Sequence, residues 1–208
     1  IGMGQFIHAV RRNINMIYIV MNNGCYGLTK GQDSATADKG SSSRKGSPNP
    51  FEAIDLCETA IQLGAGFVAR GFSGDKEQLV PIIKAAIGHK GFALVDVISP
   101  CVTFNNTPSS TKSYHWVRDH MEAMAAFDFV PVRKKITAEY EEGSSQTVAL
   151  HDGSLIQLYK SDNSFDVTNR PAAIQALEQH REMGQILTGI LHVNDQLEDT
   201  HEILNVTE

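Results

Sequence analysis

The chain has few cysteines, no long apolar segment and no excess of positive charge, and each absence excludes a class of protein. Its 208 residues include three cysteines, Cys25, Cys57 and Cys101, whose spacings do not match a disulfide framework. No stretch approaches the run of about 20 apolar residues that crosses a bilayer, and no signal peptide is visible. These features favour the cytoplasm and indicate no contact with a membrane.

The balance of charge argues against a nucleic-acid partner. Eighteen Lys and Arg residues stand against 24 Asp and Glu residues, which gives a formal net charge of -6. A chain of this charge lacks the basic surface that binds a phosphate backbone. Its hydrophobic fraction of 41% is ordinary for a globular protein, and 208 residues can bury a full core. We therefore expect one globular domain plus an extension.

A short apolar strand near the start of the chain ends in small and amide residues. Residues 16–21 are apolar and rich in β-branched side chains, as expected of a strand that is covered on both faces of its sheet. Asn22, Asn23 and Gly24 end this run abruptly. Parallel α/β sheets bind ligands beyond the carboxyl ends of their strands, so this is a candidate ligand site.

The residues that follow this strand suit a magnesium ion and a phosphate group. The Asn23 side-chain oxygen and the Cys25 carbonyl are hard, neutral ligands for Mg²⁺, and they lie two residues apart. Glycines at positions 24, 27 and 31 let the backbone approach a phosphate, while Thr29 and Lys30 add a hydroxyl group and a positive charge. The spacing alone leaves open the alternative of a turn without chemical importance.

The pattern around this strand predicts alternating helices and strands. We expect helices over residues 4–12, 50–63 and 75–88, and further strands over residues 67–70 and 92–98. This alternation predicts an α/β fold with a doubly wound parallel sheet.

The pattern changes after Cys101, which suggests a C-terminal α+β extension. We expect a polar loop over residues 105–113, a helix over 114–127, hairpin strands over 136–140 and 147–159 with a turn at 151–154, a helix over 171–183 and a closing strand over 186–191. The predicted division is therefore a first domain over residues 1–104 and an extension over residues 105–208.

The segment from Asn22 to Thr36 resembles a known cofactor signature. Its sequence, Asn-Asn-Gly-x-Tyr-Gly-Leu-Thr-Lys-Gly-Gln-x-Ser-Ala-Thr, is similar to the second half of the thiamine-diphosphate motif in the β subunits of 2-oxoacid:ferredoxin oxidoreductases. The resemblance implies the thiamine-diphosphate-binding fold, with residues 1–104 as the C-terminal part of that domain. It also implies that Asn23 binds Mg²⁺ through its side chain and that Cys25 does so through its carbonyl.

Other residues of this motif acquire roles from the same resemblance. Gly27, Leu28 and Thr29 would line the diphosphate and thiazolium region. Leu28 and Lys30 would face the substrate. A cation at Lys30 would suit the distal carboxylate of 2-oxoglutarate, and the alternative is that Lys30 contacts phosphate or a partner subunit.

A second match involves Cys101. The segment from Val95 to Asn105 resembles the family segment that supplies the last thiolate to a 4Fe-4S cluster. Such a cluster normally needs four cysteines, and without the resemblance a lone cysteine after a strand is more often inert. Cys57 illustrates that second case, because it falls on the periodic pattern of a helix and is expected to pack in the core.

The chain departs from the family pattern at its start. It opens at Ile1-Gly2-Met3-Gly4, just beyond the point where the family has Gly-Asp-Gly, so the aspartate ligand of Mg²⁺ and three cluster cysteines are missing. We therefore expect these 208 residues to be the C-terminal part of a longer polypeptide and to be unable to catalyse the reaction alone.

The resemblance implies a full activity for the longer protein. This is the oxidative decarboxylation of 2-oxoglutarate to succinyl-CoA, with thiamine diphosphate, Mg²⁺ and a 4Fe-4S cluster as cofactors, and with coenzyme A, ferredoxin and an α subunit as partners. The alternatives are the corresponding pyruvate:ferredoxin oxidoreductase and a non-catalytic remnant that acts as a binding module.

Overall fold

The computed structural model describes most of the chain, and the elements below refer to that part. The described residues are 2–28, 31–40, 48–99, 137–149, 155–162 and 164–204. The predictions for Thr29, Lys30 and Cys101, for a helix over 114–127 and for a turn at 151–154 lie outside them.

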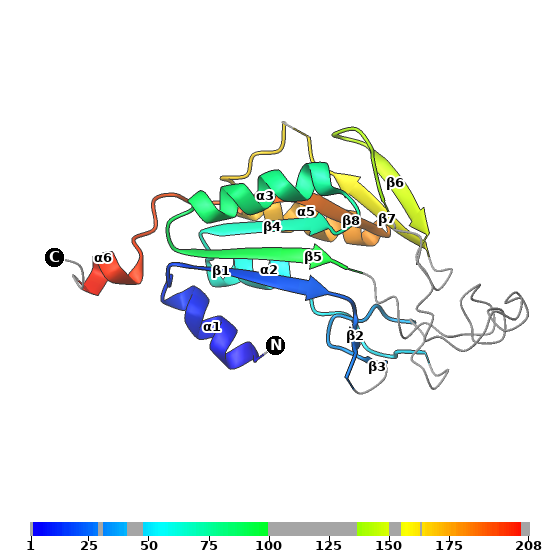
Figure 1. Ribbon diagram of the computed structural model, residues 1–208, viewed down its shortest axis with the longest axis horizontal. Coiled ribbons are helices and arrows are strands. Elements are labelled where there is room, and N and C mark those ends of the chain that lie inside the picture. The colour runs from blue at the N-terminus through cyan, green and yellow to red at the C-terminus, as the bar shows by residue number, and fades with distance from the viewer. Residues whose placement is uncertain are drawn as a thin grey trace, which may run out of the picture.

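A six-stranded mixed sheet forms the centre of the fold (Figure 1). Its strands lie in the order β1 (Met16–Asn22), β5 (Phe92–Ile98), β4 (Phe67–Phe72), β8 (Gln185–Val193), β7 (Leu155–Lys160) and β6 (Ser145–Ala149). β1, β5 and β4 are parallel, β8 is antiparallel to β4 and parallel to β7, and β6 is antiparallel to β7. The predicted α/β fold is confirmed, although the sheet is only partly parallel.

The strands of the predicted extension continue this same sheet. The predicted strand over residues 186–191 is confirmed as β8, which lies between β4 and β7 in the sheet. The hairpin of β6 and β7 is confirmed, whereas residues 137–140 form no strand; among them, Ala138 is buried and donates its N–H to the Gly74 carbonyl. The division at residue 104 stays a prediction, and residues on both sides of it supply strands to one sheet.

Helices cover both faces of the sheet (Figure 1). α1 (Met3–Arg11), α2 (Leu56–Leu63) and α5 (Arg170–Glu182) pack on one face through a shared cluster that includes Phe6, Cys57 and Leu177. α3 (Lys76–Gly88) packs on the other face through Ile82 and Ala86, and α6 (Thr200–Leu204) follows β8. This arrangement is the doubly wound architecture expected from the alternation of elements.

Local sequence signals set the ends of α2 and α3. Asp75 accepts a hydrogen bond from the Gln78 N–H at the start of α3, and Gly64 ends α2 with a φ of 88°. α2 begins after Asp55 and not at Pro50 as predicted. The reason is that the chain before Asp55 bonds to an earlier loop: the Ile54 N–H donates to the Ala35 carbonyl, and the Asn49 side chain donates to the Ala37 carbonyl.

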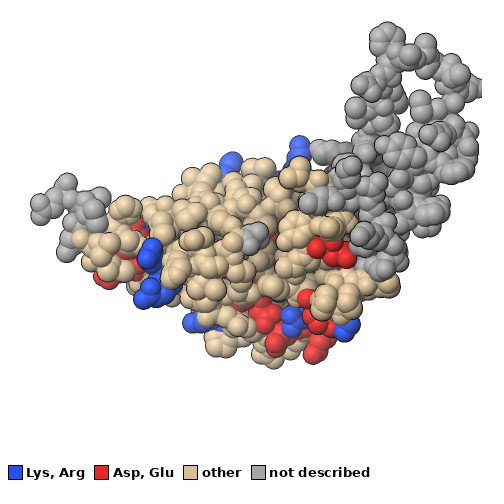
Figure 2. All heavy atoms as spheres, turned by 90° about the horizontal axis from the view of Figure 1, so that it is seen from below, with Lys and Arg blue, Asp and Glu red and all other residues tan. Residues whose placement is uncertain are grey.

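β1 is covered on one face only within the described chain. Tyr18 and Val20 pack against the cluster that contains α1, whereas Ile19 and Met21 on the other face are 45% and 59% exposed. The prediction of a strand covered on both faces is therefore wrong here, because β1 lies at the edge of the sheet and α3 packs over β4 and β5. Figure 2, which shows the molecule from below, has a largely uncharged middle, with charged side chains mainly toward the margins of the view.

A buried ion pair joins β7 to the start of α3. The Lys160 ammonium lies 2.8 Å from a carboxylate oxygen of Asp75, and both side chains are largely buried. The same ammonium lies 4.5 Å from the centre of the Tyr140 ring, and the Tyr140 hydroxyl is hydrogen bonded to Thr188 in β8. These contacts hold the C-terminal strands against the N-terminal part of the fold.

Candidate functional site at the carboxyl edge of the sheet

The carboxyl ends of β1, β5 and β4 meet at one edge of the sheet. Asn22 lies opposite Ile98 in the register of β1 and β5, and Ile98 lies opposite Phe72 in the register of β5 and β4. Beyond the last pair, the Ser99 N–H donates a 2.8 Å hydrogen bond to the Asn22 carbonyl. Parallel pairing thus holds the chain that leaves β5 against the chain that leaves β1, at the edge where such sheets bind ligands.

The segment after β1 folds back as a small hairpin. β2 (Cys25–Tyr26) pairs with β3 (Gln32–Asp33) in antiparallel fashion, with Cys25 opposite Asp33. Gly24 has a φ of 67°, a left-handed conformation that favours glycine, and its carbonyl accepts the Ser34 N–H at 3.0 Å. The sequence analysis did not predict this hairpin, because two-residue strands leave no periodic signal.

The two predicted magnesium ligands are adjacent at the base of this hairpin. The exposed Asn23 side chain accepts a 3.1 Å hydrogen bond from the Cys25 N–H through its Oδ1 atom. An amide oxygen has a second acceptor position, so this bond leaves Oδ1 able to bind a cation. The neutral oxygens of Asn23 and Cys25 therefore fit a hard divalent ion. Within the described ranges, no three His, Cys, Asp or Glu side chains gather into a metal site.

Two of the residues predicted to contact cofactor and substrate, Gly27 and Leu28, directly follow β2. Gly27 is half-buried, and Leu28 is 98% exposed. Tyr26, the last residue of β2, is 51% exposed. The hairpin therefore presents two large apolar side chains outward, and the roles of Gly27 and Leu28 stay predictions.

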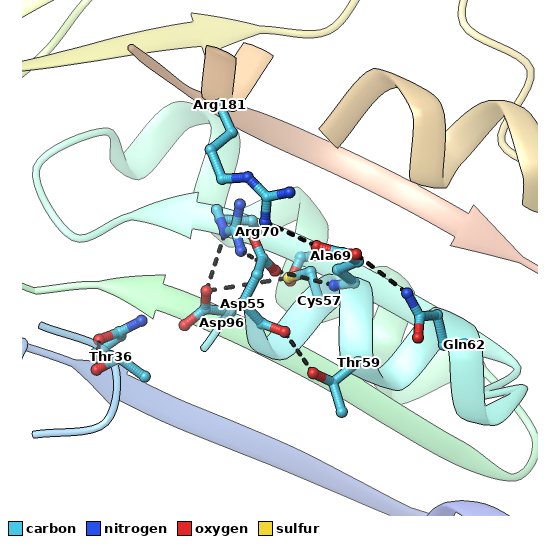
Figure 3. A network of polar contacts seen from close by, with 11 residues as sticks. Thr36, Asp55, Cys57, Thr59, Gln62, Ala69, Arg70, Asp96 and Arg181 are labelled. Carbon is cyan, nitrogen blue, oxygen red and sulfur yellow. Dashed lines mark hydrogen bonds and ion pairs between the residues drawn. The ribbon is translucent and has the colours of Figure 1, made fainter. Parts of the chain in front are cut away.

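A buried charge network, which the sequence analysis missed, lies behind this edge (Figure 3). Arg70 of β4 donates from Nε to Asp96 of β5 at 2.9 Å and from an Nη atom to Asp55 at 2.7 Å. Asp96 is fully buried, and its Oδ1 atom has no hydrogen-bond partner among the described residues. The sequence does contain a signal for this pair, because β4 and β5 each have one charged residue among apolar ones. Charges in buried strands are usually paired with each other.

The environment of this network favours ionised Asp55 and a neutral thiol at Cys57. Burial raises the pKa of Asp55, but the Arg70 guanidinium and the Glu58 N–H outweigh burial and hold that pKa below its usual range. Burial raises the pKa of the Cys57 thiol well above its usual value. Cys57 is fully buried in the cluster beneath α2, which confirms its prediction as a core residue.

The network is connected to the hairpin through the chain before α2. Asp55 caps α2 by accepting the Glu58 N–H at 2.9 Å, and the preceding Ile54 N–H donates to the Ala35 carbonyl at 2.8 Å. Arg70 therefore joins β4 and β5 to the start of α2. The residue before that start, Ile54, is hydrogen bonded to Ala35, which follows the hairpin.

No helix in the described part of the chain is both long and apolar enough to cross a membrane.

Residues 1–97 match the family model described as thiamine pyrophosphate enzyme, C-terminal TPP binding domain.

Curated proteins with similar sequences are subunits of oxidoreductases. A 2-oxoacid:ferredoxin oxidoreductase subunit beta from Sulfolobus sp is 42% identical over 137 residues, which are 65% of this chain and 44% of the relative. The corresponding subunit from Saccharolobus solfataricus is 47% identical over 55% of this chain and 37% of its own length. The 2-oxoglutarate synthase subunit KorB from Methanocaldococcus jannaschii is 44% identical over 50% of this chain and 39% of its own length. The matches thus span less than half the length of these relatives.

A solved structure has a similar fold over nearly the whole chain. It is a 2-oxoglutarate:ferredoxin oxidoreductase from Magnetococcus marinus with 2-oxoglutarate, coenzyme A and succinyl-CoA bound. The TM-score is 0.69 at 25% sequence identity, and the match covers 99% of this chain and 56% of the other.

Replacing Arg70 with methionine tests the weight of the buried network. Arg70→Met leaves the buried Asp96 carboxylate without its cation, so we expect a loss of about 3 to 5 kcal/mol in the free energy of unfolding. Adding Asp96→Leu to this variant should restore part of the loss. Arg181→Met is the control. The Arg181 side chain is 56% exposed where it pairs with Glu58, so this substitution should cost at most about 1 kcal/mol. Urea unfolding measures all three variants, and equal losses at Arg70 and Arg181 would contradict this account.

Proposed function

The chain is homologous to β subunits of 2-oxoacid:ferredoxin oxidoreductases, which confirms the resemblance drawn from its motifs, and from this premise we propose that it forms the cofactor-holding part of such a subunit. The observation that carries the proposal is the hairpin after β1, where Asn23 and Cys25 present neutral oxygens at the carboxyl edge of a parallel sheet. The activity of the complete protein is then the oxidative decarboxylation of a 2-oxoacid.

The proposed cofactor is thiamine diphosphate bound through Mg²⁺. Asn23 would bind the ion through Oδ1 and Cys25 through its carbonyl, while Gly27, Leu28 and Thr29 would line the diphosphate and thiazolium region. When bound, thiamine diphosphate supplies the nucleophilic carbon and the electron sink that decarboxylation requires. The Cys25 N–H holds the Asn23 side chain in one direction, which would orient its Oδ1 atom toward the ion.

Cys101 is proposed as one thiolate ligand of a 4Fe-4S cluster. The support is that Cys101 comes only two residues after Ser99, whose N–H is hydrogen bonded to the Asn22 carbonyl. Two residues of chain span at most about 7 Å. Cys101 would hold the cluster near the end of β5, and the chemistry that a cluster would supply there is one-electron transfer toward ferredoxin.

The proposed substrate is 2-oxoglutarate, with coenzyme A as the acyl acceptor. Both are bound in the Magnetococcus marinus enzyme, and KorB relatives are named for 2-oxoglutarate. Lys30 would pair with the distal carboxylate of the substrate, and Leu28 would contact its carbon chain. Pyruvate has no such carboxylate, so it would gain nothing from Lys30.

An α subunit is the proposed partner at the hairpin. β-subunit relatives imply a second type of subunit, and the exposed Tyr26 and Leu28 side chains would be covered by it. Large apolar side chains exposed together commonly mark such contacts.

We also propose, from the cysteine usage, that the enzyme works in the cytoplasm.

Asn23→Ala tests the cofactor site. The change removes the proposed side-chain ligand, so the Mg²⁺ concentration that half-saturates thiamine diphosphate binding should rise by at least about tenfold. Asn194→Ala is a matched control, because Asn194 accepts the Gln196 N–H at 3.1 Å in the same two-residue geometry. Binding is measured by calorimetry on the assembled enzyme at several Mg²⁺ concentrations. An unchanged Mg²⁺ requirement in Asn23→Ala would refute the assignment.

Lys30→Ala tests the choice of substrate. A charge-assisted hydrogen bond contributes about 1.5 to 3 kcal/mol, so its loss should reduce the preference for 2-oxoglutarate over pyruvate by about one to two orders of magnitude in kcat/KM. Lys30→Arg should keep most of the preference, and Lys84→Ala on the exposed side of α3 should keep all of it. If Lys30→Ala leaves the preference unchanged, Lys30 does not select the substrate; if the wild type prefers pyruvate, the pyruvate alternative replaces the proposal.

A further inference from the structure

We propose that Thr36 is a positioning residue, which directs the magnesium ligand Asn23 through a hydrogen bond to the neighbouring Asn22. This inference rests on the proposed function, since it assigns a role toward the same ion. Thr36 lies 13 residues beyond Asn23, and Figure 3 shows it beside β1, apart from the Arg70 network. Its hydroxyl lies 2.8 Å from the Asn22 Oδ1 atom.

The direction of each proton in this contact follows from the acceptors. Asn22 Oδ1 can only accept, so the one hydroxyl hydrogen of Thr36 points to it. The Ser34 hydroxyl, 2.9 Å from the Thr36 hydroxyl, must then donate its own hydrogen to Thr36. The Ser34 oxygen in turn accepts the Thr36 N–H at 3.2 Å. The hydrogen bonds from Ser34 through Thr36 to Asn22 therefore have only one possible arrangement of donors and acceptors.

The bond from Thr36 adds to other bonds that hold the main chain around Asn22 and Asn23. The Asn22 carbonyl accepts the Ser99 N–H at 2.8 Å, and the Gly24 carbonyl accepts the Ser34 N–H at 3.0 Å. Successive side chains of an extended segment point to opposite sides, so a backbone that places the Asn22 side chain on the side of Thr36 places the Asn23 side chain on the other. Asn22 is half-buried and Asn23 is exposed, in agreement with this alternation. The Thr36 hydroxyl stabilises this backbone by holding the Asn22 side chain.

Thr36 itself sits at a well-anchored point. The preceding Ala35 carbonyl accepts the Ile54 N–H, directly before the Asp55 cap that Arg70 holds. The following Ala37 is buried, and its carbonyl accepts the Asn49 side chain at 3.0 Å. The bonds of the neighbouring residues therefore hold Thr36 in place, and its hydroxyl in turn holds the Asn22 side chain.

Two substitutions separate the hydroxyl from the shape of Thr36. Thr36→Val keeps the shape and removes the hydrogen bond, whereas Thr36→Ser keeps the hydroxyl. Asn22→Leu removes the acceptor of the same bond and serves as a second route if Thr36→Val does not fold. Thr59→Val is the control, because Thr59 is also half-buried and donates its hydroxyl to the Asp55 carbonyl at 2.7 Å, while the bonds of the Asp55 carboxylate to Arg70 and Glu58 stay in place.

The first readout needs no cofactor. Hydrogen exchange at the Cys25 amide reports on the bond to Asn23 Oδ1, and exchange along β5 reports whether the sheet stays folded. We expect faster exchange at Cys25 in Thr36→Val and Asn22→Leu, with β5 unchanged, and wild-type exchange in Thr36→Ser and Thr59→Val.

The second readout is the Mg²⁺ requirement for thiamine diphosphate binding by the assembled enzyme. Loss of one neutral hydrogen bond should raise the half-saturating Mg²⁺ concentration about two- to tenfold in Thr36→Val, and Thr36→Ser should restore it. Wild-type behaviour of Thr36→Val in both readouts would overturn the inference, as would equal impairment of Thr36→Ser or Thr59→Val. Failure of the proposed function has a different signature: the wild-type enzyme would bind no thiamine diphosphate at saturating Mg²⁺, and both proposals would fall.

Discussion

The parallel pairing of β1 with β5 is the constraint on which the candidate site depends. It runs in register from Met16 opposite Phe92 to Asn22 opposite Ile98, and it is extended by the bond from Ser99 to the Asn22 carbonyl. Because of this pairing, two motifs more than 70 residues apart in the sequence leave the sheet side by side. One begins the hairpin with Asn23 and Cys25, and the other leads to Cys101. A shift of β1 by one residue would turn every side chain of the strand to the opposite face.

The charge network around Arg70 connects this sheet to the chain that follows β3. Arg70 bonds to a carboxylate of the neighbouring strand and to the cap of α2, and the residue before that cap bonds to Ala35. A buried ion pair is costly to desolvate, so its value here lies in the geometry that it fixes more than in net stability. The described residues 31–40 and 48–55 are thereby anchored to the core, and Thr36 in turn bonds to Asn22.

What the sequence predicted correctly were features with a local cause. The start of α3 near residue 75, the end of α2 at residue 63 and the strand at Phe92–Ile98 follow from neighbouring residues. The features that it missed have non-local causes. Whether β1 is covered depends on where α3 packs, the start of α2 depends on bonds to Ala35 and Ala37, and the antiparallel place of β8 depends on the whole sheet. The motif from Asn22 to Thr36 suggested the ligands in advance, but not the hydrogen bonds that orient them.

The central claim is that one edge of this sheet holds a thiamine diphosphate–metal site beside an iron–sulfur cluster. Electron paramagnetic resonance on the assembled enzyme tests it most directly, with Mn²⁺ in place of Mg²⁺ and the cluster reduced. The account predicts that Mn²⁺ broadens the cluster signal when thiamine diphosphate is bound, and that the broadening disappears in Asn23→Ala. A cluster signal that is absent, or that bound Mn²⁺ leaves unchanged, would contradict it.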